Sequence, residues 1–319
     1  MKQGIIGIDI GGTKISVSLG TRKGKILAKK VFSSGNGKRV KDSIERIESS
    51  VSSLLSECRF KKQQLAGIGV AVPGVIHPHS QVIQKSPNLP SWEGFPLRSV
   101  LMRRFKLPVI IENDANAAAL GEQYFGSGRS VRDFLYLTVS TGIGGGIVAN
   151  GALIRGEGGM AGEVGHMTLV KNGLRCHCGK RGCLEAYSSG TAIAGHVKRA
   201  LKAGAKSNYF KNIKLSKITG QLVSEAARVR DTVAIQARRL AADYLGMGLA
   251  NLINLLNPKR IILGGGVMEN VDHFWQPMMK AVRQEAWPMA LRSCRIMRSK
   301  LRKNVGDLGA MALILDSQK

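Results

Sequence analysis

Three cysteines and a histidine gather in the segment HMTLVKNGLRCHCGKRGC, residues 166–183. Three thiolates and one imidazole nitrogen make a closed tetrahedral zinc site, the type that holds metal for structure rather than catalysis. The candidate ligands are His166, Cys176, Cys178 and Cys183. The Cys-x-Cys spacing departs from the commoner Cys-x-x-Cys knuckle, so the residues alone leave a simple thiol-bearing loop open as the alternative. His177 is expected to face solvent, and the isolated Cys58 and Cys294 are interpreted as ordinary packing or surface residues.

Glycine-rich turns after apolar runs are the second chemical signal. They occur in DIGGTK (9–14) and STGIGGG (140–146), and a third glycine run, GGG (264–266), follows RIIL. Glycine lets backbone N–H groups approach a phosphate closely, and Thr13 and Lys14 add a hydroxyl and a positive charge. The first two turns match neither the Walker pattern nor the dinucleotide fingerprint, and each alone is typical of a tight hairpin. Their recurrence favours phosphate binding.

The elements that position these residues alternate between strands and helices. The same order of apolar strand, glycine turn and second strand appears twice, which predicts two halves built alike. From about Ser188 the pattern becomes helical, with a long helix that ends at Asn257 and Pro258. The expected strands cover 5–20, 25–33, 65–74, 108–116, 134–154 and 260–266, and the expected helices cover about 43–55 and 229–256, with a closing helix in GDLGAMALILDS.

Length and composition indicate a globular protein with a sizeable core. The chain has 319 residues, of which 44% are hydrophobic, enough for one large domain or two. Neither a signal peptide nor a membrane span is expected, so we predict a cytoplasmic protein with reduced cysteines.

Basic residues far outnumber acidic ones. The 48 Lys and Arg against 21 Asp and Glu give a formal charge of +27, which attracts polyanions in general. These residues are scattered, and few aromatic residues lie among them to stack on bases. A solvated basic face is therefore favoured over specific nucleic-acid binding.

Five motifs, in order, resemble the ROK family of bacterial sugar kinases and sugar-responsive repressors. They are DIGGTK, IENDANAAALGE (111–122), LTVSTGIGGGIV (137–148), GGMAGEVGHM (158–167) and the cysteine motif CHCGKRGCLE. The resemblance implies the α/β, actin-like or hexokinase-like (ribonuclease H-like) fold, with two domains, a cleft between them and a closing motion. We expect a small domain over 1–116, rejoined by the C-terminal helix at about 304–319, and a large domain over 117–303 that carries the zinc-binding loop.

The resemblance also implies site residues. It makes Asp114 the catalytic base and strengthens the zinc interpretation, because the cysteine pattern is matched in full. The sugar-binding positions are Gly74, Asn113, Asp114, Glu163, His166 and Glu185. The positions for ATP and Mg²⁺ are Asp9, Gly11, Gly12, Thr13, Lys14, Thr141, Gly142, Gly264, Gly265 and Gly266, with Gly190 and Thr191 as weaker candidates. Zinc bound to one ring nitrogen of His166 is expected to leave the other nitrogen for the sugar.

Each acidic candidate has an ordinary structural alternative. A sugar hydroxyl is a poor nucleophile, so a carboxylate such as Asp114 that accepts its proton helps phosphoryl transfer. Asp114 or Asn113 could equally cap the following helix. Asp9, to which the resemblance assigns water-mediated Mg²⁺ binding, could form an Asx turn at the strand end. Gly74, after Pro73, could serve a turn alone.

The sequence predicts an ATP-dependent hexose kinase, most simply a glucokinase. N-acetylglucosamine, N-acetylmannosamine, mannose and fructose remain alternative substrates, and a sugar-responsive regulator is the rival class. Family repressors carry a helix-turn-helix domain before the sugar domain, whereas the phosphate motif here begins at residue 9. The expected cofactors are ATP, Mg²⁺ and structural Zn²⁺. The expected partners are the sugar and a second or further copy of the chain, as a dimer or tetramer, with no specific nucleic acid and no membrane.

Overall fold

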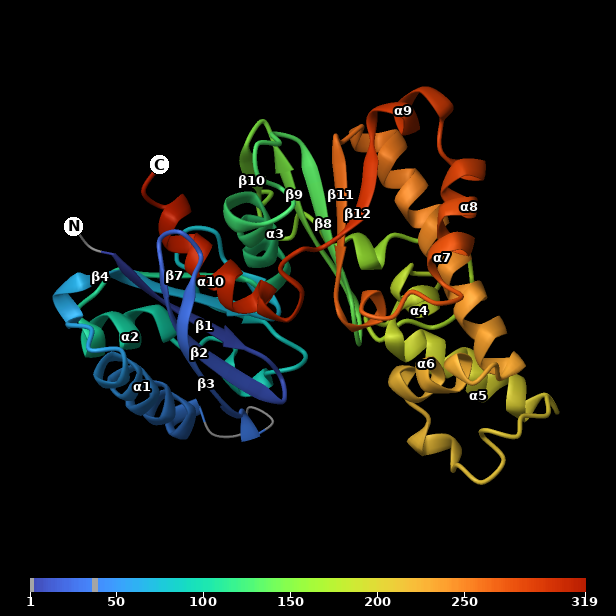
Figure 1. Ribbon diagram of the computed structural model, residues 1–319, viewed down its shortest axis with the longest axis horizontal. Helices are drawn as coiled ribbons and strands as arrows, with labels where there is room; N and C mark the ends of the chain where they lie inside the picture. The colour runs from blue at the N-terminus through green and yellow to red at the C-terminus, as the bar shows by residue number, and fades with distance from the viewer. Residues whose placement is uncertain (1–2, 36–39) are drawn as a thin grey trace. The chain divides into compact units, whose positions relative to one another are not determined.

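The computed structural model describes residues 3–35 and 40–319, and they form a mixed α/β structure (Figure 1). Contacts within the chain group it into two compact units. The first unit comprises residues 1–132, 146–162 and 299–319, and the second comprises 133–145 and 163–298. The sequence predicts a first domain over 1–116 joined by 304–319. The first unit also takes in 117–132 and 146–162, because helix α3 (Asp114–Phe125) packs against the C-terminal helix α10 (Val305–Asp316).

Two five-stranded sheets have the same arrangement. The first has the order β3-β2-β1-β4-β7 and the second has the order β10-β9-β8-β11-β12. In the first, β2 is antiparallel to β1 and β3, while β4 is parallel to β1 and β7. In the second, β9 is antiparallel to β10, and β11 is parallel to β8 and β12. This duplication confirms the prediction of two halves built alike.

The strands lie close to their predicted positions. The first sheet consists of β1 (Gly4–Ile10), β2 (Lys14–Thr21), β3 (Ile26–Ser33), β4 (Leu65–Val72) and β7 (Val109–Asn113). The second sheet consists of β8 (Phe134–Val139), β9 (Ile143–Ala149), β10 (Ala152–Ile154), β11 (Arg260–Gly264) and β12 (Arg295–Arg298). A small hairpin consists of β5 (Val75–Ile76) and β6 (Ile83–Lys85).

Alternating side chains give the first sheet a core on each face. Ile6 and Ile8 of β1 belong to a large apolar cluster that includes residues of α1 (Val40–Glu57) and α2 (Leu97–Phe105). Ile5, on the opposite face of the same strand, packs in a cluster with Leu308 and Met311 of α10. Helices therefore cover both faces, which fixes the strand ends where the candidate catalytic residues lie.

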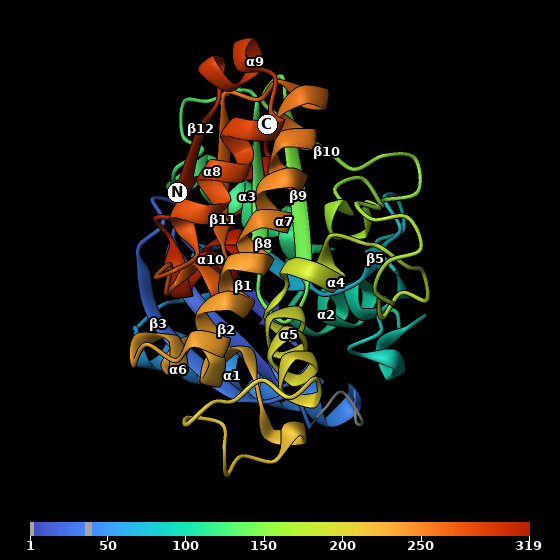
Figure 2. The same cartoon turned by 90° about the vertical axis from the view of Figure 1, so that its right-hand side faces the viewer.

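Helices dominate the second unit after residue 184. They are α4 (Glu185–Ser188), α5 (Gly190–Lys202), α6 (Gly220–Arg228), α7 (Thr232–Leu256), α8 (Trp275–Glu285) and α9 (Pro288–Ser293). The long helix α7 packs against α8, as Figures 1 and 2 show. It ends where the sequence predicts, because Asn257 takes the left-handed conformation with φ of 41° and donates its N–H to the carbonyl of Ile253. Among the described residues, no helix has the length and apolarity needed to cross a membrane.

Candidate active site

The DIGGTK turn joins β1 to β2 as a tight hairpin. The Gly11 N–H donates to the carbonyl of Lys14 at 2.8 Å, and the Ser34 hydroxyl donates to the carbonyl of Gly12 at 2.7 Å. The side chains of Thr13 and Lys14 are exposed. The hairpin expected from the sequence is confirmed, and it leaves one hydroxyl and one ammonium group accessible to a ligand. Phosphate binding by the turn stays a prediction.

Asp9, at the end of β1, lies in a cluster of carboxylates. Burial raises its pKa to about 7, with further contributions from Asp114 and Asp307, while Lys14 and Lys29 oppose the shift. Asp307, in the first turn of α10, is itself satisfied, because it accepts from the Ser16 hydroxyl at 2.6 Å and pairs with Lys29 at 2.9 Å. Asp9, Asp114 and Asp307 therefore share one electrostatic environment. The sequence interpretation did not single out Asp307, although an acidic residue between glycines at a helix start was a visible signal.

The raised pKa of Asp9 predicts a dependence of stability on pH. Between about pH 4 and 7 the folded protein keeps a proton on Asp9 that the unfolded chain has released, so folding stability falls as the pH rises through this range. The expected slope approaches about 1.4 kcal/mol per pH unit and flattens above pH 7. Asp9→Asn is expected to remove this contribution.

Urea denaturation of both proteins without Mg²⁺ or nucleotide, at intervals from pH 4.5 to 8, measures the difference. The variant is expected to gain stability relative to the wild type as the pH rises to 7, and then to hold that gain. A difference that does not change with pH would show that Asp9 titrates normally.

Asn113 and Asp114 have separate roles at the start of helix α3. The Asn113 side chain caps the helix, because its Oδ1 accepts from the N–H groups of Ala115 at 2.9 Å and Asn116 at 3.1 Å. Its Nδ2 donates to the carbonyl of Gly74 at 2.9 Å. Asp114 is exposed at the first helical position, and its Oδ1 accepts from the adjacent N–H of Ala115 at 2.9 Å. The cap expected from the sequence thus belongs to Asn113.

Gly74 has a structural reason to be glycine. Its φ is +116°, and a Cβ at this position would overlap the carbonyl of Lys85. The turn that follows β4 therefore requires glycine whether or not a sugar binds. Its carbonyl nonetheless holds the Asn113 amide, which connects this turn to the start of α3.

The three predicted sugar ligands of the second unit lie around the cysteine segment. Glu163 and His166 approach each other, with Oε2 and Nε2 separated by 3.8 Å. Glu185 begins α4, and its Oε2 accepts from the N–H of Ile143 at 2.8 Å. Its other oxygen lies 3.7 Å from the sulfur of Cys176. The structure therefore brings these acidic residues to the cluster, as the sequence predicts.

The four candidate zinc ligands converge on one point. Their ligand atoms all lie within 4.8 Å of one another. The Cys178 and Cys183 sulfurs are 3.7 Å apart, and the Cys176 sulfur is 3.8 Å from Nδ1 of His166. Zn–S bonds of about 2.3 Å in a tetrahedron place two sulfurs about 3.8 Å apart, so the set fits zinc. His166 directs Nδ1 to the cluster and Nε2 to Glu163, while His177 is exposed and is not a member.

A pocket of about 840 Å³ lies in the second unit beside the glycine turn at residues 140–142. Its lining includes Ser140, Thr141, Gly190, Thr191, Gly266, Lys198, Arg228 and Arg238. The loops are tied together, because Gly190 donates its N–H to the Ser140 carbonyl at 2.7 Å and Thr191 donates its hydroxyl to the Thr141 carbonyl at 2.8 Å. This is the cavity that an adenosine group could occupy.

The predicted nucleotide glycines contribute unequally to this pocket. Gly266 lines it, whereas Gly264 and Gly265 do not. A Cβ on Gly264 would overlap the Tyr136 hydroxyl, and Gly265, with φ of +89°, lies against the Val139 carbonyl. Gly142 is also absent from the lining, and a Cβ there would overlap the Glu185 carboxylate. Packing therefore accounts for three of these glycines, and their contact with nucleotide stays a prediction.

Arg238 lines this pocket, and the sequence analysis did not predict it. It is fully buried, and its guanidinium donates to the carbonyl groups of Asp272 at 3.0 Å and Asn270 at 2.7 Å. The sequence carried no signal for it, because Arg238 occupies an ordinary position in a long helix.

Comparisons with known proteins agree with this architecture. The ROK family profile matches residues 5–317. The chain is 35% identical to a glucokinase of Halalkalibacterium halodurans over 311 residues, covering 97% of this chain and 94% of that protein. It is also 33% identical to a xylose repressor of Caldicellulosiruptor bescii over 315 residues, covering 98% and 78%.

A solved structure supports the same relationship. The ROK glucokinase of Streptomyces griseus, in complex with glucose and AMPPNP, has a TM-score of 0.80 and 32% identity, with 99% of this chain and 100% of that chain covered. The predicted two-domain, actin-like and hexokinase-like fold is thus confirmed. The matched relatives include both enzymes and regulators.

Proposed function

The chain belongs to the ROK family, and on that premise we propose that it is an ATP-dependent sugar kinase that phosphorylates the 6-hydroxyl of a hexose. Glucose is the first candidate, because relatives at about a third identity over nearly the whole chain are named glucokinases. N-acetylglucosamine, N-acetylmannosamine, mannose and fructose are the alternatives.

One observation carries the proposal. Asp114 is close enough to Asp9 to raise the pKa of Asp9, so an exposed carboxylate and the glycine turn lie at the same end of the first sheet. Asn113 supplies the helix cap, which means that α3 does not depend on the Asp114 carboxylate for its start. A carboxylate held at a rigid helix start and beside a phosphate-binding turn suits a general base for phosphoryl transfer.

In the proposed reaction, the Asp114 carboxylate accepts the proton of the sugar 6-hydroxyl. The hydroxyl oxygen forms a bond to the γ-phosphorus of ATP as the bond from that phosphorus to the β,γ-bridging oxygen breaks, and ADP leaves. Thr13 and Lys14 would donate to phosphate oxygens from the exposed side of the turn. Mg²⁺, when bound, offsets the triphosphate charge, and Asp9 would hold it through water.

We further propose that Glu163, His166 and Glu185, together with Asn113 and Gly74, recognise the sugar hydroxyls. The four zinc ligands support this role, because zinc bound to Nδ1 of His166 would hold the ring with Nε2 beside Glu163, another predicted sugar ligand. Zinc would thereby affect sugar binding only by holding the His166 ring in place.

A sugar-responsive regulator is the second candidate, favoured by the match to a xylose repressor over 98% of this chain. A regulator needs to bind sugar without turning it over, whereas a kinase needs Asp114 and the phosphate turn. Both of the latter features are present in this chain.

A coupled phosphorylation assay with ATP and Mg²⁺ distinguishes a sugar kinase from a sugar-responsive regulator. We expect turnover of one sugar among glucose, mannose, fructose, N-acetylglucosamine and N-acetylmannosamine, with the ADP released equal to the sugar phosphate formed. Sugar binding by calorimetry without turnover of any of them would support the regulator.

A further inference from the structure

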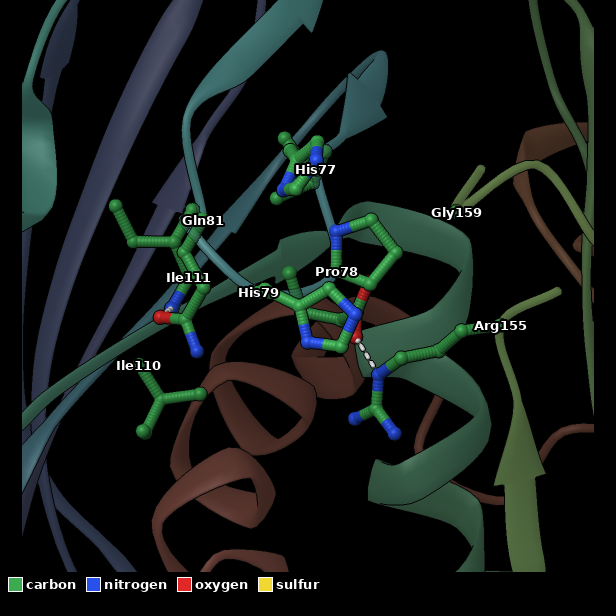
Figure 3. Close-up of a pocket in the computed structure, with 10 residues that line it drawn as sticks. His77, Pro78, His79, Gln81, Ile110, Ile111, Arg155 and Gly159 are labelled. Carbon is green, nitrogen blue, oxygen red and sulfur yellow. Dashed lines mark hydrogen bonds and ion pairs between the residues drawn. The ribbon is translucent and has the colours of Figure 1, made fainter. Parts of the chain in front are cut away.

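A second, smaller cavity lies in the first unit and has no part in the proposed reaction. Its volume is about 260 Å³, and Figure 3 shows the side chains around it. The lining comes from the hairpin of β5 and β6, from β7 at the edge of the first sheet, and from the segment after β10. None of the predicted catalytic or sugar-binding residues lines it.

Two side chains that line this cavity carry donor groups with no hydrogen-bond partner among the described residues. Arg155 donates Nε to Glu112 at 2.6 Å, but its two terminal nitrogens make no hydrogen bond within residues 3–35 and 40–319. The Gln81 Oε1 accepts from the Ile111 N–H at 3.0 Å, which fixes the amide orientation and leaves its NH₂ group as a donor with no partner in the same part of the chain.

Acceptors are scarce by comparison. Glu112 is the single carboxylate among the residues that line the cavity, and both of its oxygens are engaged. Its Oε1 accepts from the Asn113 N–H at 2.9 Å and from Nδ2 of Asn116 at 3.2 Å, while Oε2 accepts from Arg155. The cavity therefore offers donors from Arg155 and Gln81 and no free carboxylate, an arrangement that suits a tetrahedral anion.

We propose that this cavity binds the phosphate group of a small anion. The two terminal nitrogens of Arg155 donate to two of its oxygens, and the Gln81 amide donates to a third. Free phosphate and the phosphate of a hexose phosphate present the same group, and the volume of about 260 Å³ admits both.

Anion binding in this cavity is expected to affect the start of helix α3. Arg155 neutralises Glu112, and Glu112 holds Asn113 and Asn116 in place. An anion on Arg155 weakens this pairing and loosens the position of Asn113, which raises the KM for sugar. This consequence rests on the proposed function, whereas the binding itself does not.

Gln81→Glu is the sharpest test of binding. A carboxylate keeps an acceptor for the Ile111 N–H but replaces the amide donor with a negative charge, so the fold is retained and the anion is repelled. Gln84→Glu, an exposed position in β6 outside the cavity, gives the matched charge control. Arg155→Lys provides a second variant, which keeps a positive charge beside Glu112 and removes the two terminal guanidinium nitrogens.

Isothermal titration with inorganic phosphate, and separately with glucose 6-phosphate, is run on these proteins and on Lys14→Ala, which alters only the glycine turn. We expect at least a tenfold loss of affinity in Gln81→Glu and Arg155→Lys, unchanged binding in Gln84→Glu, and binding that persists in Lys14→Ala. Stronger binding of one anion identifies the source of the phosphate group.

Two results would overturn the binding proposal. One is the absence of binding to the wild type; the other is binding lost in Lys14→Ala but kept in Gln81→Glu, which places phosphate at the glycine turn and leaves the proposed function intact. The effect on sugar is tested by the KM with and without phosphate. If phosphate raises the KM for sugar equally in the wild type and in Gln81→Glu, the proposed effect of the bound anion on α3 is overturned.

Discussion

Asp114→Asn is expected to lower kcat by about 10² to 10⁴-fold, the range that a general base contributes to proton transfer. The change removes the proton acceptor while it keeps the size and polarity of the side chain. Because Asn113 supplies the cap of α3, the melting temperature is expected to stay close to that of the wild type. The KM for sugar is expected to change much less than kcat, since an asparagine can still donate to or accept from a hydroxyl.

Steady-state kinetics over a range of sugar concentrations, together with thermal melts, measures both effects. Asp42→Asn is the matched control, because Asp42 is also an exposed aspartate in the first turn of a helix. It is expected to leave kcat unchanged. An Asp114→Asn variant that keeps more than a tenth of the wild-type kcat would exclude Asp114 as the base.

The duplicated fold could be predicted from the sequence because its signals are local. Strand periodicity and glycine turns are read over ten to twenty residues, and the end of α7 at Asn257 follows from one residue in the left-handed conformation. The convergence of His166 with the three cysteines was likewise predictable, since one compact segment carries all four.

The residues that were missed depend on contacts between distant parts of the chain. Asp307 meets the hydroxyl of Ser16 across 291 positions of sequence, so its role exists only once α10 packs on the first sheet. The cavity that we propose for anion binding likewise combines Gln81 with Glu112 and Arg155, which no spacing rule connects.

Glycine patterns proved ambiguous for a different physical reason. A run such as residues 264–266 looks uniform in sequence, but absence of a side chain serves close packing at Gly264 and Gly265 and open access at Gly266. Sequence shows that the side chain is missing but not what fills its space. The same ambiguity applies to Gly74, which the backbone needs in any case.

Loss of one zinc ligand is expected to release the metal and destabilise the segment 166–183. Zinc binding to a structural site contributes about 10–16 kcal/mol in zinc-finger peptides, so even a fraction of that value exceeds ordinary side-chain effects. Cys178 gives the clearest variant because it is exposed, and its thiol has little packing to lose. Without a metal, Cys178→Ser should be nearly silent; with one, it should lower the melting temperature and raise the KM for sugar at least tenfold through His166.

Metal content by mass spectrometry, thermal melts and sugar kinetics are measured on Cys178→Ser, with Cys294→Ser and His177→Gln as controls. Cys294 lies outside the cluster, and His177 lies between two ligands without belonging to it. We expect one zinc per chain in the wild type and in both controls, and less than a tenth of that in Cys178→Ser. A variant that loses zinc but keeps the wild-type KM would separate the metal from sugar recognition, because His166 would then hold its position by packing alone.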